Sequence, residues 1–263
     1  MEPAADTRLH AVEAGRGEGA PLVFLHGFGA GAGFWSGIQR IFSEDCATIA
    51  YDLPGHGRSA LAAGLERTGK MAGAITADFE QRGLERVHLV GHSMGGSVAT
   101  LIALRSPDTV ASMTLLAPGG YGPEINHRLL RRYACAGTRS EMLAALENMF
   151  GWNSTVPAKL LDDLVAARAE PGAIEGLEAV LDNMLRRDGD DLYQGTFSRG
   201  DLAELPMPVK VLWGTQDRVL PTRQAHRLPP MFAAHVFENT GHMLIEERPD
   251  AVISLIRQNM RAA

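Results

Sequence analysis

The sequence is poor in cysteine and has no long apolar run. Two of its 263 residues are cysteines, so Cys46 and Cys135 could pair only with each other, and a disulfide-stabilised scaffold is excluded. No stretch approaches the roughly 18 consecutive apolar residues of a membrane span. The N-terminal segment MEPAADTRLH lacks the positive region and apolar run of a secretory signal. We therefore expect a cytoplasmic protein with two reduced thiols and no membrane span.

Basic residues are also scarce. Lysine and arginine number 25 against 31 aspartates and glutamates, which gives a formal net charge of −6 with no long basic run. Nucleic-acid binding requires a basic stripe, so we expect no nucleic-acid partner. The 29 glycines follow no repeat period, which excludes a collagen-like chain. With 45% hydrophobic residues the chain can bury a core, and its length fits one or two domains.

Strand-like and helix-like segments alternate through the first half of the chain. Apolar strands are predicted at Leu22–His26, Ala47–Asp52, Arg86–Gly91 and Val110–Ala117. Near-continuous apolar strands separated by helices form parallel sheets that are covered on both faces, so the sequence predicts an α/β fold. The glycine-rich stretch AGRGEGAP, residues 14–21, predicts a hairpin turn between an N-terminal strand and the first of these strands.

The alternation of predicted strands and helices stops between Gly119 and Leu205. In this stretch the apolar residues follow helical spacing without strand alternation. The β/α alternation returns with a strand at Val209–Gly214, and a helix over about Pro249–Met260 ends it. We therefore predict an α/β core made of residues 1–118 and 206–263, with a helical cap over residues 119–205.

The segment GHSMG, residues 91–95, fits the pattern G-x-S-x-G between a predicted strand and a predicted helix. A sharp strand-to-helix turn leaves no room for side chains two residues either side of its apex, which is why glycine stands at both places. The apex Ser93 is then exposed at the positive end of the following helix. We predict that Ser93 is a nucleophile.

A serine hydroxyl is a weak nucleophile unless a histidine takes its proton and a carboxylate orients that histidine. In this architecture the chain order is serine, acid, histidine. Asp217 lies just past the strand that ends at Gly214. Of the later histidines, His226 lies in a predicted helix and His235 begins a strand, whereas His242 stands in a loop after a glycine. We predict Asp217 as the acid and His242 as the base.

The substrate oxyanion needs preset donors, one of which should be the backbone N–H of Met94, directly after the nucleophile. The other should come from the loop HGFGAGAG, residues 26–33, and we predict the N–H of Phe28. A phosphate-binding reading of this loop is disfavoured because it lacks the G-x-G-x-x-G spacing and a GK[ST]. Asp52 and His56 stand on one turn, and two ligands make no metal site, so we expect neither a metal nor a cofactor.

The motifs HGFG, DLPGHGRS, GHSMGG, WGTQD and TGHM together resemble the α/β-hydrolase superfamily in order and spacing. The resemblance implies an eight-stranded, mostly parallel sheet with helices on both faces and a helical cap insertion. Residues 116–126, LAPGGYGPEIN, are similar to the hydrolase-like domain of the dihydrolipoyl acetyltransferase component of acetoin-cleaving systems. Residues 29–35, GAGAGFW, resemble the meta-cleavage-product C–C hydrolases, which usually have Asn and Trp where His92 and Met243 stand here.

We therefore predict a serine hydrolase that cleaves a carboxylic ester, or a related acyl bond, of a small molecule through an acyl-enzyme. Trp35, Trp152 and Met243 are predicted to line its substrate pocket. Three alternatives stay open: acyl transfer to an alcohol or thiol, C–C bond hydrolysis on the same triad, and ligand binding without turnover. The sequence makes no prediction of oligomeric state.

Overall fold

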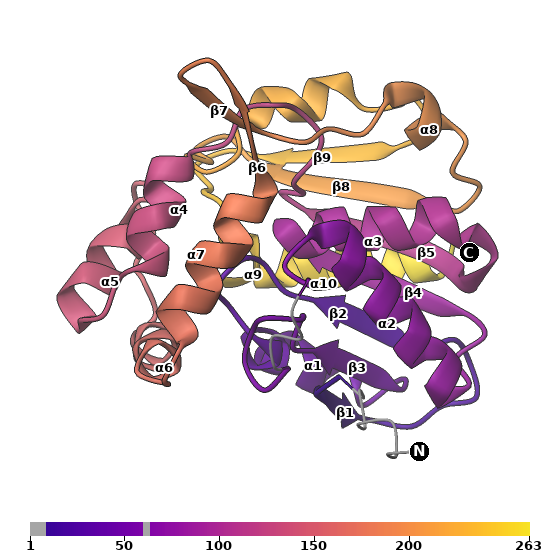
Figure 1. The fold of residues 1–263 in the computed structure, drawn as a ribbon. Coiled ribbons are helices and arrows are strands. Elements are labelled where there is room, and N and C mark those ends of the chain that lie inside the picture. The colour runs from indigo at the N-terminus through magenta and orange to yellow at the C-terminus, as the bar shows by residue number, and fades with distance from the viewer. Residues whose placement is uncertain (1–8, 60–63) are drawn as a thin grey trace, which may run out of the picture.

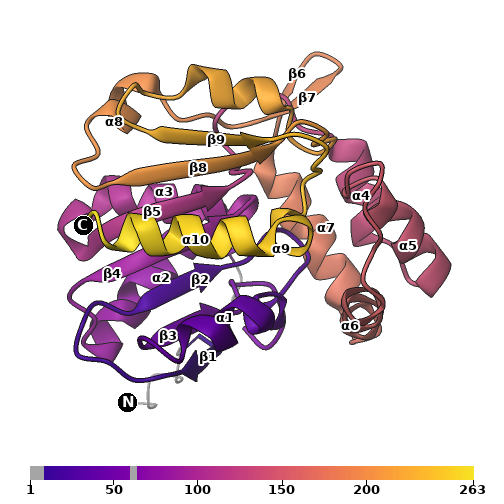
Figure 2. The same cartoon turned by 180° about the vertical axis from the view of Figure 1, so that it is seen from behind.

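The computed structural model describes residues 9–59 and 64–263, and its centre is a seven-stranded sheet (Figures 1 and 2). The spatial order is β1-β3-β2-β4-β5-β8-β9, and every neighbouring pair runs parallel except β1 with β3. The strands are β1 (Ala11–Ala14), β2 (Leu22–Leu25), β3 (Thr48–Tyr51), β4 (Val87–His92), β5 (Val110–Leu116), β8 (Val209–Gly214) and β9 (Ala233–Phe237). The predicted α/β class, with a mostly parallel sheet, is confirmed.

Helices cover both faces of this sheet. On one face lie α2 (Thr68–Arg82) and α3 (Met94–Arg105), and on the other lie α1 (Ser36–Phe42) and α10 (Pro249–Met260). Strands β2, β3 and β5 are therefore buried along their whole length, which explains their near-continuous apolar sequences. The short helices are η1 (Ala32–Trp35), η2 (Pro107–Thr109), α8 (Arg199–Ala203), η3 (Thr222–Arg227) and α9 (Leu244–Glu247). Across the described residues, no helix combines the length and apolar character that crossing a bilayer requires.

Four helices, which we call the cap helices, lie together beyond the carboxyl ends of the strands (Figures 1 and 2). They are α4 (His127–Ala134), α5 (Arg139–Glu147), α6 (Ala158–Arg168) and α7 (Ala173–Met184). A two-stranded hairpin follows them, made of β6 (Leu185–Asp188) and β7 (Asp191–Gln194). The expectation of helices alone in this stretch was wrong, because the chain leaves the helix at Met184 and Gly189, at φ 57°, turns it back on itself.

The N-terminal strand also differs from the prediction. It was expected to form a hairpin with the strand that begins at Leu22, but β1 pairs antiparallel with β3, from Ala11 opposite Tyr51 to Ala14 opposite Thr48. Both edges of β2 are already occupied by β3 and β4, so the outer edge of β3 is the one open to β1. Eight strands were expected in the sheet and seven are present in residues 9–59 and 64–263; residues 1–8 lie outside the described part.

Candidate active site

Ser93 stands at the apex of a sharp turn between β4 and α3. Its backbone lies at φ 52° and ψ −117°, a strained conformation for a residue with a side chain. A Cβ on Gly91 would lie 2.6 Å from the Gly95 carbonyl oxygen, and a Cβ on Gly95 would lie 2.1 Å from the carbonyl oxygen of Leu25. The turn is therefore so tight that both neighbouring positions require glycine, and it presents Ser93 at the carboxyl end of the sheet.

We expect Gly95→Ala to destabilise the fold, because its Cβ would overlap the backbone of β2. Overpacking of this kind lowers the free energy of unfolding by about 2 kcal/mol. The matched control is Gly73→Ala in α2, where an exposed Cβ would meet nothing within 4 Å and alanine should be neutral or stabilise by roughly 0.5–1 kcal/mol. Urea unfolding of both variants measures the difference, and equal effects would contradict the steric account of the turn.

His242 and Asp217 form a buried pair. The distance from His242 Nδ1 to Asp217 Oδ2 is 2.8 Å, and their side chains are 4% and 0% exposed. The other carboxylate oxygen, Oδ1, accepts the backbone N–H groups of Val219 and Leu220, both at 2.8 Å. Because an ionised carboxylate only accepts, Nδ1 of His242 carries the hydrogen, and its Nε2 lone pair is left free to accept a proton.

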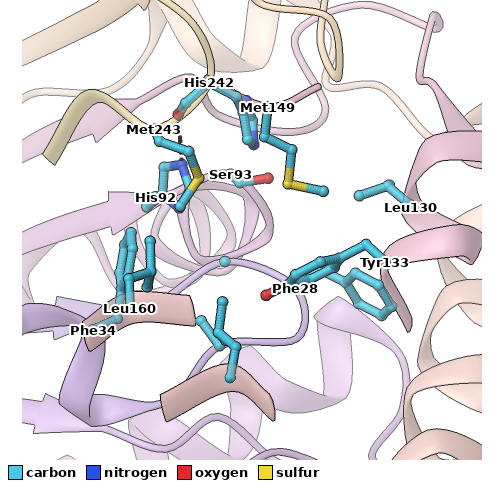
Figure 3. Close-up of a pocket in the computed structure, with 13 residues that line it drawn as sticks. Phe28, Phe34, His92, Ser93, Leu130, Tyr133, Met149, Leu160, His242 and Met243 are labelled. Atoms are coloured by element: carbon cyan, nitrogen blue, oxygen red, sulfur yellow. Dashed lines mark hydrogen bonds between the residues drawn. The ribbon is translucent and has the colours of Figure 1, made fainter. Parts of the chain in front are cut away.

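Ser93 and His242 line the same pocket, into which the Ser93 hydroxyl points (Figure 3). No hydrogen bond joins these two described side chains in the resting structure. Catalytic hydrogen bonds of this kind are often long before substrate binds and shorten in the reacting complex. The structure thus brings the three predicted residues into one site, with the histidine–aspartate contact formed and the serine–histidine contact open.

The loop that carries His242 is held through its backbone. The His242 N–H donates to the carbonyl oxygen of Met149 at 2.7 Å. The carboxylate of Glu247 accepts the N–H of Gly241 at 2.9 and 3.1 Å, and also the N–H of Gly151 at 2.8 Å. These contacts fasten the loop to the segment that follows α5. Sequence reasoning missed both of these roles. Met149 accepts through a backbone oxygen, which leaves no side-chain signal. Glu247 accepts backbone N–H groups through its carboxylate, and no local pattern marks such a contact.

The loop after β2 packs directly on the nucleophile. A Cβ on Gly27 would lie 3.2 Å from the Ser93 Cβ, and the Ala30 N–H donates to the Gly27 carbonyl oxygen at 3.3 Å across a turn with Gly29 at φ 72°. In the described part of the chain, neither the Phe28 N–H nor the Met94 N–H has a hydrogen-bond partner. Both donors are therefore free to bind an oxyanion, and their assignment as the oxyanion hole stays a prediction.

Two cap helices contact this loop. The Gly29 carbonyl oxygen accepts the Tyr133 hydroxyl of α4 at 3.2 Å and Nη1 of Arg168 of α6 at 3.0 Å. The Arg168 guanidinium lies over the Tyr133 ring, 4.8 Å from its centroid. Its Nε and Nη2 are buried and have no partner in the described chain. The cap helices thus reach the loop that carries the predicted oxyanion donor, and the Arg168 guanidinium keeps two N–H positions without a partner next to this loop.

Apolar and aromatic side chains dominate the pocket around Ser93 (Figure 3). It has an empty volume of about 400 Å³, part of which is open to solvent. The lining residues are Gly27, Phe28, Ala30, Phe34, His92, Ser93, Leu130, Tyr133, Met149, Leu160, Leu164, His242 and Met243. Such a lining suits an apolar substrate with few polar groups.

Two of the three predicted pocket residues lie elsewhere. Trp35 is fully buried in the core, with its ring 5.0 Å from that of Phe24, and the neighbouring Phe34 faces the pocket in its place. Adjacent residues of η1 point in different directions, so only one of the two rings can face the pocket. Trp152 is 73% exposed on the surface. Met243 lines the pocket.

Three buried histidines near the site, His26, His56 and His92, are neutral. Burial lowers the pKa of His56 and of His92 to about 3, and it also lowers the pKa of His26. Asp52 accepts the N–H groups of Ala32 at 2.6 Å and of Arg58 at 2.8 Å, so its carboxylate is bound to backbone. Within the described residues, no group of three or more His, Cys, Asp or Glu side chains is placed to hold a metal.

A mostly parallel sheet with a serine at a strand-to-helix turn, facing an aspartate-paired histidine under a helical cover, defines the α/β-hydrolase class of protein. The model of the alpha/beta hydrolase family matches residues 22–255. The chain belongs to this family.

Two relatives with different named activities are similar over most of this chain. The dihydrolipoyllysine-residue acetyltransferase component of the acetoin cleaving system of Cupriavidus necator is 32% identical over 254 residues, which are 93% of this chain and 65% of that protein. The chain therefore spans about two thirds of the length of that relative. The 2-hydroxy-6-oxo-6-phenylhexa-2,4-dienoate hydrolase of Comamonas testosteroni is 30% identical over 265 residues, 94% of this chain and 88% of that protein.

Solved structures of low sequence identity share the fold. The 2-hydroxy-6-oxo-6-phenylhexa-2,4-dienoate hydrolase from Rhodococcus sp. strain RHA1 superposes with a TM-score of 0.83 at 22% identity, over 97% of this chain and 95% of that one. A carboxylesterase from Bacillus subtilis gives a TM-score of 0.82 at 20% identity, over 98% and 90%. One architecture thus serves both C–C hydrolases and carboxylesterases.

Proposed function

We propose that this protein is a serine hydrolase that cleaves a carboxylic ester, or a related acyl bond, through an acyl-enzyme on Ser93. The observation that carries the proposal is the buried contact of 2.8 Å between His242 Nδ1 and Asp217, in the pocket where Ser93 stands on its strained turn. That contact sets the histidine tautomer that a general base needs.

The residues would act in two half-reactions. Ser93 Oγ attacks the ester carbonyl while His242 Nε2 takes the hydroxyl proton, and the N–H groups of Phe28 and Met94 bind the oxyanion. Protonated His242 then gives its proton to the departing alcohol, which leaves an acyl group on Ser93. Water attacks the acyl-enzyme by the same route, so that the carboxylic acid leaves and Ser93 regains its proton.

The apolar lining supports an uncharged, compact acyl group. The cavity volume that a water-sized group can occupy is about 30 Å³, far below the range of roughly 300–1,000 Å³ for small-molecule sites, so only a small acyl group fits the pocket as it stands. We expect kcat/KM for p-nitrophenyl esters to be highest for short acyl chains and to fall about tenfold or more for long ones. Initial rates across an acyl series, with Ser93→Ala as the blank, measure this. Activity that rises steadily to the longest chain would contradict the pocket assignment, and no turnover of any ester would favour a ligand-binding protein.

A second candidate is C–C bond hydrolysis, and one observation favours it. Arg168 has a buried Nε and Nη2 without partners in the described chain, and it lines a larger cavity that shares residues with the Ser93 pocket. Such a guanidinium is suited to a substrate carboxylate. A 2-hydroxy-6-oxo-dienoate assayed beside the esters, by loss of its absorbance, separates the two activities. If the dienoate is the better substrate, Arg168→Met should raise its KM while leaving the KM of neutral esters nearly unchanged.

Acyl transfer is tested in a parallel reaction. A thiol acceptor added to the ester assay would reveal transfer by the appearance of its acylated product.

A further inference from the structure

We propose that His92 is a positioning residue for the general base, and that its Nε2–H hydrogen bond to the backbone carbonyl of His242 fixes where the His242 ring stands relative to Ser93. This inference rests on the proposed function, in which His242 takes the proton of Ser93. His92 itself exchanges no proton with the substrate.

The contact is direct and its polarity is determined. His92 Nε2 lies 3.0 Å from the His242 carbonyl oxygen, and the dashed line in Figure 3 marks it. A carbonyl oxygen only accepts, so Nε2 carries the hydrogen and Nδ1 does not. That Nδ1 is buried without a partner in the described chain, next to Gly27. His92 is therefore held in one tautomer, with its single N–H aimed at the base's own backbone.

His92 also joins the two halves of the site. It precedes Ser93 at the end of β4, whereas His242 lies 150 residues further along the chain. The Met149 carbonyl oxygen accepts the N–H of His242, and the Glu247 carboxylate accepts the N–H of Gly241. The described structure gives the His242 carbonyl oxygen only the His92 side chain as a partner. Among the hydrogen bonds of the described residues, the one from His92 Nε2 to the His242 carbonyl oxygen connects the base loop to the residue that precedes the nucleophile.

The resting geometry makes this contact matter for rate. No hydrogen bond yet joins Ser93 to His242, so the alignment of the two depends on how the base loop is held. The rings of His92 and His242 are 4.8 Å apart between centroids. Burial, reinforced by His242, lowers the pKa of His92 to about 3. His92 therefore stays neutral at working pH and adds no charge against the imidazolium that forms on His242 during the reaction.

The test compares two replacements of similar size. Gln in His92→Gln can place its amide nitrogen near the site of the imidazole Nε2 and keeps the donor, whereas His92→Met keeps apolar volume and has no donor. We expect His92→Met to lower kcat by about 100-fold, since a displacement near 1 Å of a reacting group has this cost, with KM changed less than about threefold. His92→Gln should retain most of the activity.

The matched control is His88→Met on the same strand. The His88 ring lies away from the site, where its Nδ1 is 2.8 Å from the Ser112 hydroxyl. The kcat of His88→Met should equal that of wild type.

Thermal unfolding and fluorophosphonate labelling rates complete the design. Labelling should slow in parallel with kcat in His92→Met, because phosphonylation of Ser93 uses the same base. Equal losses in the Gln and Met variants would overturn the proposal, because packing alone would then explain them; so would full activity in His92→Met. If Met at this position prevents folding, the Gln variant decides: a loss of about 100-fold in kcat with an unchanged unfolding midpoint would also overturn it. Wild type that neither hydrolyses esters nor takes the label would instead contradict the proposed function.

Discussion

Replacing Ser93 with alanine is expected to lower kcat/KM for ester hydrolysis by about 10⁴- to 10⁶-fold, because the change removes the atom that forms the acyl-enzyme. The Ser93 hydroxyl points into the pocket and makes no hydrogen bond to another described side chain, so its loss should leave the fold intact. Binding and the oxyanion donors would account for the residual rate. Steady-state kinetics and the thermal unfolding midpoint, measured on the same preparations, check both expectations.

Ser97→Ala is the matched control for this variant. Ser97 lies one helical turn further along α3 and does not line the pocket, so its loss should leave kcat/KM at the wild-type value. Adding His242→Ala to Ser93→Ala should cost little more, since the three residues act as a unit. If Ser93→Ala retains more than about one hundredth of the wild-type rate, Ser93 is not the nucleophile, because the residual rate that the oxyanion hole alone provides is far lower.

Asp217→Asn is expected to lower kcat by about 10⁴-fold through the tautomer of His242. Asp217 Oδ1 accepts two backbone N–H groups, from Val219 and Leu220, so the amide oxygen of an asparagine should take that position. The amide NH₂ would then face His242 Nδ1 and donate to it. Nδ1 becomes the acceptor, Nε2 must carry the hydrogen, and the ring cannot take a proton from Ser93.

Asp217→Ala separates this mechanism from simple loss of charge. Alanine removes the carboxylate without imposing a donor on Nδ1, and water can fill the vacated space. We therefore expect Asp217→Asn to be no more active than Asp217→Ala, although asparagine is the closer match in shape. Kinetics of both variants under identical conditions check this, and a clearly more active asparagine variant would contradict the assigned tautomer.

The parts of the site that could be predicted from sequence are those in which side-chain identity carries the chemistry. Glycines two residues either side of Ser93 are required by close backbone approach, so they mark the turn in any sequence that forms it. The strand at Val209–Gly214 was predicted with its observed bounds, because an apolar run ended by glycine leaves few alternatives. Asp217 and His242 followed from chain order, and the structure brings them within 2.8 Å.

The features that escaped prediction depend on packing between distant segments. Phe34 and Trp35 are adjacent aromatic residues, and only the packing of Trp35 on Phe24 determines which ring faces the pocket. The pairing of β1 with β3 depends on which sheet edge is open, which no local pattern encodes. The hydrogen bond from the His242 N–H to Met149 is accepted by a backbone oxygen, which every residue type possesses.

Covalent labelling with a fluorophosphonate tests the central claim most directly. The reagent reacts with a serine that a general base activates, and the mass of the intact protein reports how many groups are attached. The proposed function predicts one phosphonyl group per chain, located by peptide mass spectrometry on Ser93, and no label on Ser93→Ala under the same conditions. Ester hydrolysis by a wild-type protein that carries no label on Ser93 would contradict it.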